Sequence, residues 1–75
     1  MEKYIYNLGC LEGSSKFVLK ELLEKHSDVE IIKGGKDNII FSSSNENITA
    51  FKDLYSPVYI QNNKGERLNL SKRDW

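Results

Sequence analysis

Two hydrophobic periodicities alternate along this chain, and their order constrains the fold more than any other feature. Short runs rich in β-favouring residues occupy residues 3–8, 29–32, 39–41 and 58–60, which is typical of strands. Two longer segments with helical spacing, residues 16–26 and 46–55, separate them. The predicted order is therefore β-α-β-β-α-β, which places the chain in the α+β class.

Each predicted helix has one apolar face and a polar residue suited to its start. Ser14 or Ser15 precedes the first helix, and Asn45 or Ser44 precedes the second, and such side chains accept a backbone N–H bond at a helix start. Pro57 prevents the second helix from continuing. The apolar faces are formed by Val18, Leu19, Leu22, Leu23 and His26 in the first helix and by Ile48, Phe51, Leu54 and Tyr55 in the second.

The connections between the predicted strands decide how they pair. Gly34-Gly35 predicts a tight hairpin with positive φ between the second and third strands. With both crossovers right-handed, the order predicts a ferredoxin-like fold, a four-stranded antiparallel sheet with two helices on one face. The other face is either solvated or covered by a partner. Residues 68–70 form a possible short edge strand.

Size and charge limit the kinds of protein this chain can be. Its 75 residues form one domain at most, and 11 basic and 11 acidic side chains balance, which excludes a strongly basic nucleic-acid binder. Residues 1–63 carry a net −2 and residues 64–75 a net +2. We therefore expect a domain over 1–63, followed over 64–75 by a basic segment or linker to a missing domain. With one cysteine, no signal peptide and no apolar run of about 20 residues, the sequence predicts a cytoplasmic protein away from membranes.

The residues needed for catalysis do not form any recognisable pattern. His26 is the only histidine and Cys10 the only cysteine, and their expected roles are a capping or surface residue and a buried structural thiol. Gly34-Gly35 lacks the spacing of a phosphate-binding loop, and the acidic residues suggest neither an acid–base pair nor a metal site. Aromatic residues on the predicted strands are expected to pack in the sheet, since the signature of an RNA-recognition motif is missing from residues 38–42.

The basic C-terminal segment has two interpretations. It is either a solvated tail or linker, or a surface for phosphate contact and base stacking that includes Trp75. An exposed terminal tryptophan suggests that a further domain follows. On the second interpretation, the candidate RNA-binding residues are Lys64, Arg67, Lys72 and Arg73, followed by Lys33 and Lys36.

Several stretches together resemble one family. They are similar to the N-terminal ferredoxin-like region of THUMP-associated RNA methyltransferases. The similar stretches are residues 4–8, Gly13 before the helical 21–24 stretch, residues 28–35 ending in a glycine turn, and residues 39–41, 48–54 and 58–60. The resemblance implies a non-catalytic accessory domain that helps to position tRNA or rRNA beside a THUMP domain. It also implies that S-adenosylmethionine is bound by a separate methylase domain, so that this chain itself holds no cofactor.

A second hypothesis belongs to a different class of function. A neutral chain of this size also fits a free-standing protein-interaction module, such as a phage or regulatory protein, that acts through its sheet or an edge strand. A small enzyme is the least favoured class, because no acid–base or nucleophilic pair is evident.

Overall fold

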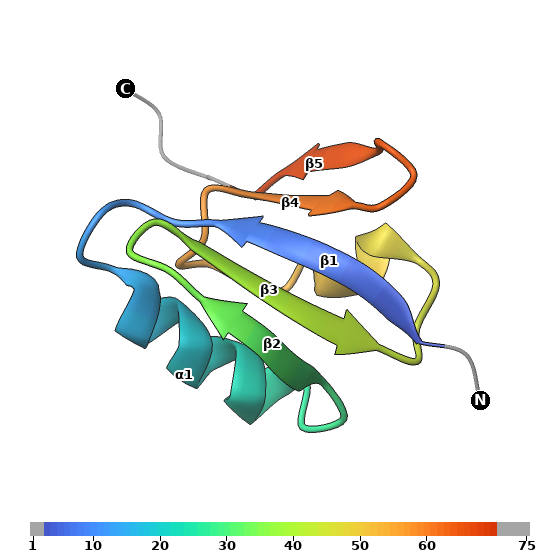
Figure 1. The fold of residues 1–75 in the computed structure, drawn as a ribbon, viewed down its shortest axis with the longest axis horizontal. Helices are drawn as coiled ribbons and strands as arrows, with labels where there is room; N and C mark the ends of the chain where they lie inside the picture. The colour runs from blue at the N-terminus through green and yellow to red at the C-terminus, as the bar shows by residue number, and fades with distance from the viewer. Residues whose placement is uncertain (1–2, 71–75) are drawn as a thin grey trace.

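A computed structural model describes residues 3–70, which form one antiparallel sheet, one α-helix and one short 3₁₀ turn (Figure 1). In chain order the elements are β1 (Tyr4–Gly9), α1 (Ser15–Lys25), β2 (Glu30–Gly34), β3 (Asn38–Ser43), the 3₁₀ turn η1 (Ile48–Phe51), β4 (Tyr59–Asn62) and β5 (Arg67–Asn69). The α+β class predicted from the sequence is confirmed.

The five strands lie in the spatial order β2-β3-β1-β4-β5, and every neighbouring pair is antiparallel. β1 and β2 therefore run parallel to each other with β3 inserted between them. Both α1 and η1 lie behind the sheet in the view of Figure 1, so they cover the same face. No helix of residues 3–70 covers the opposite face of the sheet.

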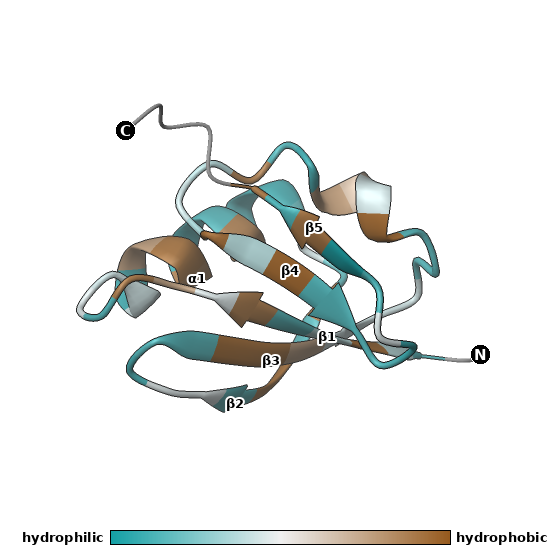
Figure 2. Cartoon of the chain, turned by 90° about the horizontal axis from the view of Figure 1, so that it is seen from above, coloured by the Kyte–Doolittle hydropathy of each residue, from teal (hydrophilic) through white to brown (hydrophobic). Residues whose placement is uncertain are grey.

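Alternation along the strands directs one set of side chains into the core between the sheet and the helix layer. Five core-facing strand residues are at most 1% exposed: Tyr6 and Leu8 of β1, Ile39 and Phe41 of β3, and Ile60 of β4. Hydrophobic bands mark the middle of β3 and β4 in Figure 2. The rest of the core consists of Cys10, Val18, Leu22, Val29, Phe51, Leu54 and Leu70.

An aromatic cluster holds the centre of this core. The rings of Tyr6, Phe41 and Phe51 lie 4.9–5.4 Å apart between centroids, within the range in which aromatic pairs attract each other. The His26 ring packs on Phe51 at 4.7 Å. The strand aromatics Tyr6 and Phe41 are therefore packing residues, as the sequence predicts.

The prediction of a second α-helix over residues 46–55 is wrong. Only Ile48–Phe51 is helical, and it forms a single 3₁₀ turn. One contribution is local: the Asn45 side chain accepts the Asn47 N–H, and the Asn47 side chain accepts the Thr49 N–H. Such bonds from Asn side chains offer the backbone an alternative to a helix.

The chain after this turn is held by a side chain from α1. The carboxylate of Glu21 accepts the backbone N–H groups of Tyr55 and Ser56 at 2.8–3.0 Å. It also accepts a bond from the Lys25 ammonium at 3.0 Å, and that ammonium donates to the carbonyl of Asp53. Residues 53–56 are thus held next to α1 by hydrogen bonds, although they are not helical.

The sheet has five strands, so the prediction of four strands is also wrong. β5 pairs with β4, and the Leu70 N–H donates to the Val58 carbonyl at 2.8 Å. Leu70 is 3% exposed in the core, so β5 and Leu70, which belong to the predicted basic segment, pack with the domain. The possible edge strand at residues 68–70 is observed one residue earlier.

Two local predictions differ from the structure in detail. Ser14 occupies the N-cap position of α1, but its side chain makes no capping hydrogen bond. Among residues 3–70 the glycines with positive φ are Gly13 and Gly65, at 87° and 90°, so the hairpin at Gly34-Gly35 turns without the positive φ that was expected. No helix within that range is long and apolar enough to cross a membrane.

Candidate functional site

The uncovered face of the sheet brings together one residue from each of the five strands. The register pairs Lys33 with Ile40, Ile40 with Asn7, Asn7 with Gln61, and Gln61 with Arg67. Residues paired across strands point to the same face. We call these five residues the cross-strand row.

The cross-strand row has a cation at each end and amides near its middle. Its four inter-strand steps span about 19 Å at the usual strand spacing. Both Lys33 and Arg67 are exposed. Glu30 belongs to the neighbouring row on the same face, where it pairs with Ser42. The row therefore combines two positive charges with hydrogen-bonding side chains and has one acidic neighbour.

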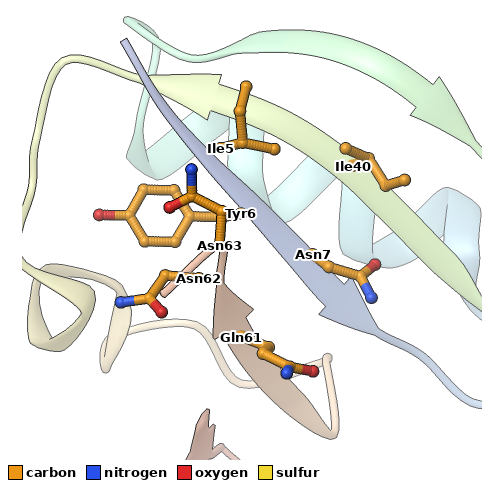
Figure 3. A pocket seen from close by; sticks show the side chains of 7 residues that line it. All are labelled: Ile5, Tyr6, Asn7, Ile40, Gln61, Asn62 and Asn63. Atoms are coloured by element: carbon orange, nitrogen blue, oxygen red, sulfur yellow. The ribbon is translucent and has the colours of Figure 1, made fainter. Parts of the chain in front are cut away.

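The middle of the row is an open hollow rather than a deep pocket. In Figure 3, Asn7 of β1 lies between Ile40 of β3 and Gln61 of β4. The Asn7 side-chain oxygen accepts a bond from Asn38 at 3.3 Å, which orients the amide. The hollow is also lined by Ile5, Tyr6, Asn62 and Asn63. An extended chain fits such a surface better than an enclosed small molecule does.

A stacked pair stands at the β4–β5 end of the row. The Arg67 guanidinium carbon lies 3.9 Å from the centroid of the Tyr59 ring, which is the geometry of a cation–π contact. The same ring occupies the space where a side chain on Gly9 would begin. Glycine on β1 thus leaves room for the Tyr59 ring, and Arg67 lies over that ring.

Of the other predicted RNA-binding residues, Lys36 and Lys64 lie apart from the row. Lys36 is in the turn between β2 and β3, in a hollow that it lines together with Lys16 and Glu12. Lys64 is in the turn between β4 and β5. Lys72 and Arg73, like Trp75, lie outside the described residues.

His26 and Cys10, for which the sequence predicts structural roles, both contact groups that fix their positions or bury them. His26 is the C-cap of α1, and its Nε2 lies 2.9 Å from the Asp53 carboxylate. Cys10 is 8% exposed, and burial, together with the negative charge of Asp37, raises the pKa of its thiol to about 11. A thiol with this pKa is protonated and poorly nucleophilic at neutral pH. In residues 3–70 no three or more His, Cys, Asp or Glu side chains are grouped so as to hold a metal ion.

The sequence reasoning missed Asn7, Gln61 and the partnership of Tyr59 with Arg67. Asparagine is depleted in strands, so Asn7 in the middle of a strand was the available signal. The sequence could not show which face of the sheet Asn7 occupies or what lies beside it, because both depend on the register of strands that are distant in sequence. An exposed apolar group of Leu11, Phe17 and Tyr55 was also missed; Phe17 alone is 70% exposed.

Comparison of the chain with protein-family models, with curated proteins and with solved structures produced no match.

Proposed function

We propose that this chain is a non-catalytic module that positions RNA on the uncovered face of its sheet. The observation that carries the proposal is the cross-strand row, with Lys33 and Arg67 about 19 Å apart across five strands. Two cations at this separation suit separate phosphates of one extended strand, and the amides between them suit hydrogen bonds to bases.

The Arg67–Tyr59 pair supplies a stacking surface. The Tyr59 ring fills the space beside Gly9 and Arg67 lies over the ring, so an incoming base would stack on the outer plane of the guanidinium. Arginine planes and aromatic rings both stack with unpaired bases. The cation–π contact holds the guanidinium in place before RNA binds. The net charge of zero predicts weak, salt-sensitive affinity.

The proposed parent protein is an S-adenosylmethionine-dependent RNA methyltransferase in the cytoplasm, with a THUMP domain beside this one. The family resemblance supports this part of the proposal. The fold would then be a variant of the ferredoxin-like one, in which η1 replaces the second helix and β5 extends the sheet. The order of the first four strands and the parallel β1 and β2 support that assignment. The cofactor and the chemistry would belong to the separate methylase domain.

A titration of labelled structured tRNA with the 75-residue chain at several salt concentrations tests the proposal. Lys33→Ala and Arg67→Ala should each weaken binding and lower the slope of log K against log salt by about one. Lys20→Ala and Lys52→Ala are matched controls, because both lysines are exposed and lie in or after the helical elements. The paired change of Lys72 and Arg73 to alanine tests the C-terminal segment separately.

Two results would contradict the proposal. The first is an absence of binding even at low salt. The second is an equal loss of affinity in the row variants and in the lysine controls, which would indicate attraction by overall charge without a defined site.

A protein-interaction module acting through an edge strand remains the second candidate function. One observation favours it: Ile32 of the edge strand β2 is 55% exposed. Backbone groups at a sheet edge together with exposed apolar side chains are the usual basis for strand addition by a partner. Failure of the tRNA titration would shift preference to this candidate.

A further inference from the structure

Among residues 3–70, the outer edge of β2 is the longer of the two sheet edges that pair with no further strand. β2 and β5 are the terminal strands of the sheet, with five and three residues respectively. β5 presents two exposed polar residues, Arg67 and Asn69. β2 instead presents an exposed isoleucine, Ile32, in an isoleucine pair flanked by Glu30 and Lys33. An edge of this kind is a template for pairing with another strand.

The charges on β2 are self-complementary about its centre. Its sequence begins Glu30-Ile31-Ile32-Lys33, with an acid and a base at equal distances from the middle of the isoleucine pair. In an antiparallel pairing of two such strands, Glu30 of one copy lies opposite Lys33 of the other, and the same contact repeats by symmetry. Within residues 3–70, neither side chain forms an ion pair or a hydrogen bond.

A bulge in β2 makes this pairing sterically consistent. The register shifts between Ile31 and Lys33, so that Glu30 pairs with Ser42 and Lys33 with Ile40 on the same face of the sheet. In a regular strand, residues three apart point to opposite faces. Because of the extra residue, Glu30 and Lys33 share a face, as side chains that meet across two strands must.

We propose that a second copy of this chain pairs with β2 in antiparallel fashion about a two-fold axis, with Glu30 of each copy opposite Lys33 of the other. The axis lies perpendicular to the sheet, so two five-stranded sheets join into one sheet of ten strands. Both uncovered faces then lie on the same side. The contact is small, and it dissociates on dilution and weakens with salt. This inference does not depend on RNA binding, and it names a partner for the edge strand.

Charge reversal tests the proposed register directly. Analytical ultracentrifugation of the full chain, from about 10 μM to about 1 mM, should show a reversible monomer–dimer equilibrium. Glu30→Lys and Lys33→Glu should each weaken dimerisation by about tenfold or more, because each places like charges opposite each other twice per dimer. Mixing the two single variants should restore association as a heterodimer, and the double swap should restore the homodimer. Lys20→Glu on α1 is the matched control and should leave the equilibrium unchanged.

Circular dichroism of each variant shows whether the exposed substitutions leave the fold intact. A chain that stays monomeric to about 1 mM would overturn the proposal. So would a dimer that persists unchanged in both single variants, which would place the contact elsewhere, for example on Leu11, Phe17 and Tyr55. Single variants that weaken association without recovery on mixing would also overturn the register.

Discussion

Replacing Glu21 with glutamine tests whether one carboxylate of α1 holds the chain segment that replaces the expected second helix. The side chain is 16% exposed and accepts bonds from the N–H groups of Tyr55 and Ser56 and from the Lys25 ammonium. Glutamine has the same shape, but it removes the charge and converts one acceptor oxygen into a donor. That donor would then face another donor.

The expected cost follows from the change in hydrogen-bond type. Bonds to a charged group contribute about 1.5–3 kcal/mol and neutral ones about 0.5–1.5 kcal/mol. Since glutamine keeps one acceptor oxygen, we expect Glu21→Gln to lower the free energy of unfolding by about 2 kcal/mol. For a domain of this size, that corresponds to a fall in Tm of roughly 8–16 °C.

The same carboxylate predicts how stability depends on pH. Burial alone raises the pKa of Glu21, but the N–H of Ser56, the Lys25 ammonium and the N–H of Tyr55 together lower it below its ordinary value. Its stabilising contribution is therefore complete above the unfolded-state pKa of about 4.3. It is lost as the pH falls through the lower pKa of the folded state. The difference in stability between wild type and Glu21→Gln should thus disappear in acid.

Thermal and urea unfolding at pH 7 and at pH 3, followed by circular dichroism, would measure both effects. Glu24→Gln is the matched control, because Glu24 is exposed on the same helix and forms no ion pair or hydrogen bond within residues 3–70. Equal stability of Glu21→Gln and Glu24→Gln at pH 7 would refute the reasoning. A Glu21→Gln deficit that persists undiminished at pH 3 would show that the carboxylate charge is not its cause.

Two further predictions concern buried positions. Gly9→Ala should destabilise the domain by about 1–3 kcal/mol, because the new methyl group would enter the space of the Tyr59 ring. Gly34→Ala is its control, since a side chain there meets nothing within 4 Å, and equal effects of the two in urea unfolding would refute the packing argument. The Cys10 thiol, with its pKa raised from 9.0 to about 11 by burial and by Asp37, should hold about 100-fold less thiolate near pH 8 than an ordinary cysteine. Labelling with a disulfide reagent should therefore be slow in the native protein and fast in urea, and fast native labelling would contradict the burial of this residue.

The elements that the sequence predicted well are those whose signals are local. α1 is observed at Ser15–Lys25, one residue from its predicted range, and Val18 and Leu22 of its apolar face are fully buried. The hairpin of β2 and β3 and the strand after Pro57 also lie within a few residues of their predicted positions. Hydrophobic period and turn residues are properties of a short stretch of chain, so they can be read without knowing the fold.

The second helix, predicted over residues 46–55, failed because local spacing does not show which distant groups will contact a segment. The apolar spacing of Ile48, Phe51 and Leu54 suits a helix, and two of these residues are fully buried. The structure buries them from a single 3₁₀ turn because Glu21, more than 30 residues earlier in the chain, satisfies the N–H groups that follow. A hydrogen-bond partner at that distance in sequence leaves no trace in the local pattern.

By itself, the sequence determined the α+β class, the first helix, the hairpin and the identity of the charged and aromatic residues. Only the tertiary structure decided that the chain after η1 stays non-helical, that β5 completes the sheet, and that Lys33 and Arg67 stand at the ends of one row. The physical reason is strand register: side chains alternate between faces with a period of two, so a slip of one residue would move each of them to the other face. Register across five strands is set by the packing of the whole core, and the candidate site exists only once that packing is in place.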